Sequence, residues 1–144
     1  MNDGSFERVS VSDNRLYGPR KVLFCGFLAK AHPAVAALLK MVGLEDVGAI
    51  YAGPAQVGET VGDLFQLPGG TGEGRDSDLP RAIILGGITE KELHQLMEGT
   101  RLSRMQPPLW AVLTPVSENW TLADLLRELA AERAALNRPD TAPS

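Results

Sequence analysis

Two pairs of residues that follow apolar strands have the types and positions to hold a ligand. Gly26 and Phe27 follow the apolar run at residues 22–25, and Gly86 and Gly87 follow the run at residues 82–85. Glycines at such turns let a ligand approach the backbone, and a helix beginning after Thr89 would offer free N–H groups to an anion. Neither pair fits GxGxxG or the GK[ST] of a P-loop. We therefore weigh a small-ligand or anion site against glycines that simply turn the chain.

A polar loop near the C-terminus is the second candidate surface. As a recognition loop it would present side chains after the last strand. As a structural corner it would stop that strand, bond its own backbone, hold the loop to the core and cap the next helix. The structural interpretation is favoured. The residues concerned are Thr114, Pro115, Ser117, Asn119, Trp120 and Thr121.

Residues that commonly perform catalysis or bind metals are few. The single cysteine, Cys25, has no histidine near it in sequence and fits a buried, inert position. His32 and His94 fit solvated or capping positions better than general bases. The sequence therefore predicts no metal site, no cofactor and no catalytic residues. An enzyme would need polar groups from distant loops, such as Thr114, Asn119 and His32, to converge.

Composition limits the class of protein. The chain has 144 residues, 44% hydrophobic and 22% charged, which fits one folded domain rather than a disordered chain. A net charge of -4 argues against a nucleic-acid partner. No apolar run approaches the roughly 20 residues of a membrane helix, and the N-terminus lacks a signal-peptide core. We expect a cytoplasmic protein without a membrane or nucleic-acid partner.

The chain divides at a stretch rich in glycine and proline. Residues 67–80 (LPGGTGEGRDSDLP) predict a flexible connector between halves at residues 21–66 and 81–137 of one α/β domain. Residues 1–20 predict a flexible arm, and residues 138–144 a disordered tail. Each half reads strand, helix, strand, helix, with strands at 22–25, 47–52, 82–85 and 109–113. Capping threonines are expected before the later helices, at Thr60, Thr89 and Thr121.

The two halves resemble each other in sequence. Residues 48–65 (GAIYAGPAQVGETVGDLF) and 109–126 (LWAVLTPVSENWTLADLL) align without a gap. Identical residues are Pro54/Pro115, Thr60/Thr121, Asp63/Asp124 and Leu64/Leu125. A duplicated β-α-β-α unit is favoured over two unrelated units that converged on similar caps.

This reading predicts a small, doubly wound, mainly parallel four-stranded sheet. Two right-handed β-α-β units, related by a twofold axis along the strands, would give the strand order 2-1-3-4 with helices on both faces. The carboxyl ends of the first and third strands would then meet at a switch point formed by Gly26, Phe27, Gly86 and Gly87. The alternative is a ferredoxin-like α+β sheet with some antiparallel pairs.

The C-terminal half carries a motif that resembles a known family. Ala111-Val112-Leu113-Thr114-Pro115 and Asn119-Trp120-Thr121-Leu122 resemble the LTP…NWTL segment of domain of unknown function 3783, an uncharacterised bacterial family. Trp110 replaces the usual lysine and Ser117 the usual asparagine. The resemblance covers about residues 81–132 and implies no activity, and the departure at Ser117 weakens any polar role carried over to that position.

The leading functional hypothesis is a non-catalytic interaction or regulatory module. Its partner would be another protein or a second copy of the chain, bound through an apolar seam on the last helix that includes Leu129 and Leu136. The alternative is a small-ligand or anion binder at the switch point.

Overall fold

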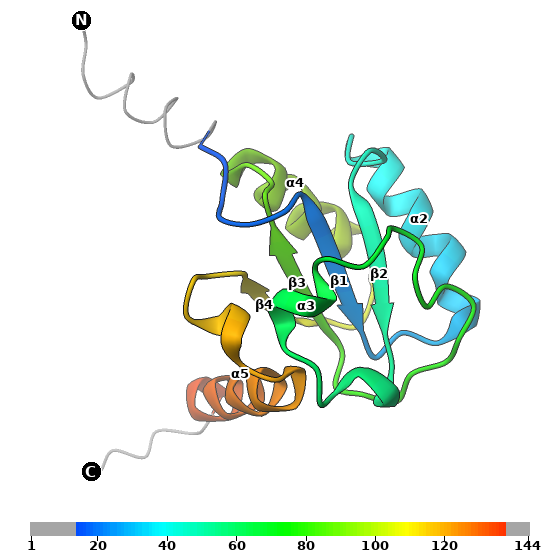
Figure 1. The fold of residues 1–144 in the computed structure, drawn as a ribbon. Coiled ribbons are helices and arrows are strands. Elements are labelled where there is room, and N and C mark those ends of the chain that lie inside the picture. Colours follow the sequence, from blue (N-terminus) through cyan, green and yellow to red (C-terminus); the bar gives the residue numbers. More distant parts are fainter. Residues whose placement is uncertain (1–13, 138–144) are drawn as a thin grey trace, which may run out of the picture.

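Four strands make one sheet in the computed structural model, which describes residues 14–137 (Figure 1). They are β1 (Lys21–Cys25), β2 (Gly48–Ala52), β3 (Ala82–Gly86) and β4 (Leu109–Val112). Their order is β2-β1-β3-β4, and the pairs β1–β2 and β3–β4 are parallel. The predicted α/β class, the strand order and the mainly parallel sheet are confirmed. The predicted tail at 138–144 and most of the predicted arm lie outside the described residues.

The helices begin where the capping residues predict. They are α2 (His32–Met41), α3 (Val61–Leu64), α4 (Glu90–Leu102) and α5 (Leu122–Asn137), with single 3-10 turns η1 (Ala29–Ala31), η2 (Pro54–Gln56) and η3 (Ser117–Asn119). The hydroxyls of Thr60, Thr89 and Thr121 each accept the N–H of the residue three places on. No helix within residues 14–137 is long and apolar enough to cross a membrane.

Side chains of the strands alternate between two apolar layers. On one face, Leu23 and Ile84 pack with α3 and α5. On the other face, Phe24 and Ile83 pack with α2 and α4. Both faces of the sheet are therefore covered by helices, which explains why residues 22–25 and 82–85 are apolar at successive positions rather than at every second one.

The central pair of strands runs against the prediction. β1 and β3 are antiparallel, with Lys21 opposite Gly86 and Cys25 opposite Ala82. Their carboxyl ends consequently lie at opposite ends of the sheet, and Figure 1 shows the two arrows pointing in opposite senses. The expected twofold axis along the strands is wrong.

The segment at residues 67–80 explains this reversal. After α3, Gly69 lies against Gly48 at the start of β2. The chain then follows the outer edge of β2: Gly70 N–H donates to Ala49 O (2.7 Å) and Tyr51 N–H donates to Thr71 O (2.8 Å). It thus arrives at the end of the sheet where β1 and β2 finish, and β3 must start there. The segment is an ordered part of the sheet edge rather than the flexible connector predicted.

The two halves keep equal spacing along the chain. β3 begins 61 positions after β1, and β4 begins 61 positions after β2. Thr60 and Thr121 form an antiparallel bridge, in which Val61 N–H donates to Trp120 O and Leu122 N–H donates to Glu59 O. Since α2 and α4 share one face and α3 and α5 the other, the halves are related by an approximate twofold axis normal to the sheet.

Residues 14–20 pack on the carboxyl end of β3 rather than extending away from it. Leu16 N–H donates to Ile88 O, and Gly87 N–H donates to Tyr17 O. Arg20 then forms a two-pronged ion pair with Glu92 in the first turn of α4, with both N···O distances 2.7 Å. The Arg20 guanidinium lowers the pKa of Glu92 to about 2, and the Thr89 N–H that Glu92 accepts acts in the same direction.

We expect the Arg20–Glu92 pair to make stability depend on pH in the acid range. The pKa of Glu92 is lower in the folded chain, so its contribution is complete above the ordinary glutamate value and is lost as pH falls from about 4.5 towards 2. Glu92→Gln should lower the free energy of unfolding by about 1–2 kcal/mol at pH 7. Urea denaturation at several pH values measures this. A difference from wild type that persists unchanged at pH 2.5 would contradict it.

Candidate functional site

The structure separates the two residue pairs of the predicted switch point. Gly26 and Phe27 follow β1 at one end of the sheet. Gly86, Gly87 and Thr89 lie at the other end, because β3 runs antiparallel to β1. No single site can include residues from both ends of the sheet, so the predicted ligand site between the carboxyl ends of β1 and β3 does not exist.

The space beside these glycines is filled by the protein itself. A side chain at Gly26 would collide with the backbone of Leu79 and Arg81, and one at Gly87 would collide with the backbone of Arg20. At the start of α4, Glu90 N–H donates to Asn14 O. The glycines therefore permit close approach of neighbouring chain segments, and two of the N–H groups expected to hold an anion after Thr89, those of Glu90 and Glu92, already have partners.

The loop at residues 114–121 satisfies its own polar groups. Thr114 and Ser117 exchange hydrogen bonds, with Ser117 N–H donating to Thr114 Oγ1 (2.9 Å) and Thr114 N–H to Ser117 Oγ (3.1 Å). Asn119 Nδ2 donates to Pro115 O (3.2 Å). The Trp120 side chain is partly exposed. These contacts are those of the structural corner; the structure brings the loop residues together around η3.

The catalytic candidates do not meet. Cys25 is fully buried, and burial raises the pKa of its thiol to about 12. His94 is exposed on α4. Thr114 follows β4 and His32 follows β1, at opposite ends of the sheet. Within residues 14–137, no three His, Cys, Asp or Glu side chains cluster in a way that could hold a metal ion.

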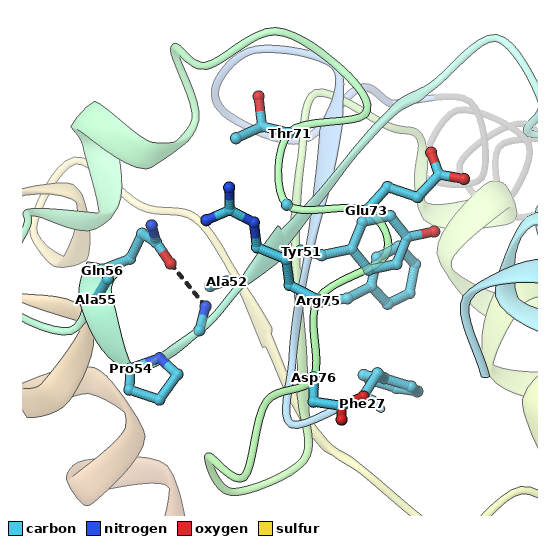
Figure 2. Close-up of a pocket in the computed structure, with 13 residues that line it drawn as sticks. Phe27, Tyr51, Ala52, Pro54, Ala55, Gln56, Thr71, Glu73, Arg75 and Asp76 are labelled. Carbon is cyan, nitrogen blue, oxygen red and sulfur yellow. Dashed lines mark hydrogen bonds between the residues drawn. The ribbon is translucent and has the colours of Figure 1, made fainter. Parts of the chain in front are cut away.

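A cavity of about 400 Å³ opens at the carboxyl ends of the parallel strands β1 and β2 (Figure 2). Phe27 comes from the turn after β1, while Tyr51, Gly53 and Gln56 come from the end of β2 and from η2. The segment from Thr71 to Asp76 supplies the remaining wall. In sheets with parallel strands, the crevice outside the carboxyl ends is the usual location of ligands. This cavity is the candidate functional site.

Close backbone contact fixes the wall at residues 71–76. Gly72 has φ of +83°, and a side chain there would meet the carbonyl of Tyr51. Asp76 Oδ1 accepts Ala29 N–H at 2.7 Å, which fastens the far end of the wall to η1. The wall is therefore held at both ends, to β2 and to the turn after β1.

His32 anchors the middle of the same wall. The ring is buried and stacks on Tyr51 at 4.0 Å between centroids. Its Nδ1 accepts Gly74 N–H at 2.9 Å, and its Nε2 lies 3.2 Å from Phe27 O. The first contact needs an unprotonated Nδ1 and the second needs a proton on Nε2, so the contacts specify the neutral Nε2–H form. His32 was predicted to be a solvated or capping group; it is not solvated, and it accepts a backbone N–H and links the wall to the sheet.

The polar groups of the cavity are unevenly placed. Gln56 Oε1 accepts Gly53 N–H at 2.7 Å, which leaves its NH₂ group available. Arg75 is exposed and forms no ion pair among residues 14–137. Figure 2 shows the Arg75 guanidinium on the same side of the cavity as Gln56, with the Glu73 carboxylate beyond the Tyr51 ring. One side of the cavity thus presents hydrogen-bond donors.

The aromatic ring of Tyr51 forms part of the cavity wall. Its ring is stacked between Phe24 and His32. Burial, and then the charge of Glu73, raises the pKa of Tyr51. Figure 2 shows the Tyr51 hydroxyl on the side of the ring near Glu73, away from Arg75 and Gln56.

Sequence reasoning found only Phe27 among the residues of this cavity. Gln56 follows the recognisable Gly53-Pro54 corner, but its capping contact to Gly53 gives no pattern of its own. Arg75 lies in the segment taken for a connector. The feature of the sequence that could have pointed to this cavity is His32, which precedes Pro33 at the start of the first helix.

Two glycines of the wall give a matched pair of variants. Gly72→Ala should lower the free energy of unfolding by about 2–4 kcal/mol, because it adds a collision with Tyr51 to the cost of a left-handed alanine. Gly74→Ala has the same backbone strain with open space around it and should cost about 1 kcal/mol. Urea denaturation compares them. Equal losses would mean that the close contact at Gly72 contributes nothing.

Comparison with known proteins gives one match. No curated protein and no solved structure matches the chain. A family model matches residues 81–136, which contain β3, α4, β4 and most of α5. The matched segment is therefore one strand–helix–strand–helix unit, the second of the two in the chain. The resemblance noted in the sequence is confirmed: the C-terminal part of this chain matches the family described as Domain of unknown function (DUF3783).

Proposed function

We propose that this chain is a non-catalytic binding module whose cavity at the ends of β1 and β2 holds a small molecule with an anionic group. The observation that carries the proposal is the Arg75 guanidinium, which lines the cavity without an ion-pair partner among the described residues. The Gln56 NH₂ group is a further donor on the same side of the cavity (Figure 2). The sequence suggested a small-ligand or anion site at the carboxyl ends of β1 and β3. The site proposed here lies instead at the carboxyl ends of β1 and β2.

An anionic group suits the donors at this side of the cavity. A guanidinium offers paired N–H groups that match a carboxylate or phosphate, and the Gln56 NH₂ adds a further donor. Of the two carboxylates on the wall, Asp76 already accepts Ala29 N–H. Glu73 lies beyond Tyr51, away from Gln56 (Figure 2). An anion beside Arg75 and Gln56 therefore need not contact either carboxylate.

Binding is favoured over catalysis by the state of the other polar groups. The Thr71 hydroxyl donates to Pro68 O at 2.6 Å, and both ring nitrogens of His32 face backbone groups. A general base or nucleophile needs a lone pair directed at the substrate. The polar groups around this cavity hold the wall in place instead.

We also propose that the chain is an internal duplication of a β-α-β-α unit that acts in the bacterial cytoplasm. Support for duplication comes from the equal 61-residue spacing of the strands and from the Thr60–Thr121 bridge. The match of residues 81–136 to a family model spans one such unit. A single buried free cysteine is consistent with a reducing compartment.

Titration followed by NMR tests the ligand proposal. ¹⁵N-labelled chain would be titrated separately with inorganic phosphate, benzoate and adenosine monophosphate. We expect at least one of them to shift the amide signals of residues 53–56 and 71–76. Arg75→Gln should weaken that binding by about tenfold or more, because the paired N–H groups are lost.

Arg104→Gln is the matched control, since Arg104 is an exposed arginine that does not line this cavity. Its affinity should equal that of wild type. Shifts outside the cavity, or equal weakening by both substitutions, would overturn the assignment of the site.

A further inference from the structure

An apolar groove, here called the α2–α4 groove, lies between α2 and the residues that follow α4, where Ser103 and Met105 line it. Its volume is about 440 Å³, and Ala34, Leu38 and Met41 of α2 face Met105 across it. Met41 is 67% exposed, although it lies beside buried Leu38. Leu102, at the end of α4, is 63% exposed. Contiguous exposed apolar surface of this kind marks interaction sites on proteins.

The margin of the groove is basic. Arg81 lines it and stacks over the Phe27 ring at 4.4 Å. Lys30 and Arg104 adjoin lining residues in sequence and are exposed. None of these three forms an ion pair among residues 14–137, whereas Arg101 nearby is paired with Glu98. The groove thus offers an apolar floor with free positive charge.

The C-terminal half of α5 exposes apolar and acidic side chains, in contrast to the basic margin of the groove. Leu122, Leu125 and Leu126 are buried and Leu129 packs partly against the same core, but Leu136 is 84% exposed. Of the two leucines predicted to form an apolar seam, Leu129 packs against the chain's own core, and only Leu136 is exposed. Ala131 and Ala135, which lie three residues after Glu128 and Glu132 on the helix, are exposed as well.

This exposed half-helix carries free negative charge. Glu128 and Glu132 are exposed and lack an ion pair among the described residues, while Arg127 is paired with Asp124. Arg133 is directed to the chain itself, with Nη2 donating to Pro108 O at 2.7 Å. Glu128, Glu132 and Leu136 recur every four residues and so lie along one side of the helix.

We propose that two copies of this chain associate by placing the exposed half of α5 of each copy in the α2–α4 groove of the other. The apolar side chains of the half-helix cover the apolar floor, and Glu128 and Glu132 meet the basic margin. The two surfaces belong to opposite faces of the sheet but lie near the same end of it. Arg133 contacts Pro108 just before β4, and Arg81 lies just before β3. Reciprocal exchange closes the assembly as a twofold dimer.

Light scattering coupled to size exclusion and sedimentation equilibrium on the full chain test this association. We expect a concentration-dependent dimer that weakens as salt is added, because opposite charges meet in the contact. Leu136→Asp and Ala34→Glu should each raise the dimer Kd by about tenfold or more. Both positions are exposed, so the variants should keep the wild-type circular dichroism and melting temperature.

Matched controls lie on the same helices. Ala36→Glu places the same charge on an exposed position of α2 that does not line the groove, and Ala130→Asp does so on α5, away from the side that carries Glu128 and Glu132. Both should dimerise like wild type. A mixture of Ala34→Glu and Leu136→Asp chains should form a mixed dimer more tightly than either variant pairs with itself, because one of the two contacts is then intact.

Three results would overturn the proposal: a wild-type monomer at every concentration up to about 1 mM, equal weakening by the controls, or a mixed dimer no tighter than the variants alone. The ligand proposal is independent of these outcomes, because Arg75 lies in the other cavity.

Discussion

The backbone pairing between residues 70–71 and the outer edge of β2 orients the second half of the molecule. Two hydrogen bonds, from Gly70 to Ala49 and from Tyr51 to Thr71, carry the chain along the length of that strand. β3 must therefore begin beside the end of β1 and run back along it. The same pairing places residues 71–76 over the ends of β1 and β2, where they become the wall of the cavity. Strand direction and the candidate site thus have one cause.

Local features of the fold could be predicted because local chemistry determines them. Thr60, Thr89 and Thr121 begin helices by accepting a backbone N–H, and that requires only residues three positions apart. The strand order followed from two similar units placed edge to edge. The sense of β3 relative to β1 could not be predicted, since an apolar strand such as residues 82–85 can pair in either direction. That choice depended on the path of residues 67–80, whose composition is typical of a linker.

The candidate site was largely hidden for the same reason. Gly72 reads as a flexible residue in sequence, yet in the fold its missing side chain allows contact with Tyr51. His32 has no neighbour in sequence that would reveal its bond to Gly74, forty-two positions away. Gly26 and Gly87 were predicted to admit a ligand and instead admit other parts of the chain. In each case the partner is distant in sequence, and residue type alone does not distinguish a ligand from another backbone segment.

The bridge at Thr60 and Thr121 has a consequence for how the two halves depend on each other. Val61 N–H at the start of α3 is satisfied by the second half, and Leu122 N–H at the start of α5 by the first. β1 and β3 likewise complete each other's ladders. A fragment limited to residues 81–137 would lack Glu59 O as the acceptor for Leu122 N–H and Val61 N–H as the donor to Trp120 O. It would also expose the edge of β3 that pairs with β1. Two such fragments have the complementary groups to replace the missing half for each other, so the covalent link converts an association between units into an intramolecular one.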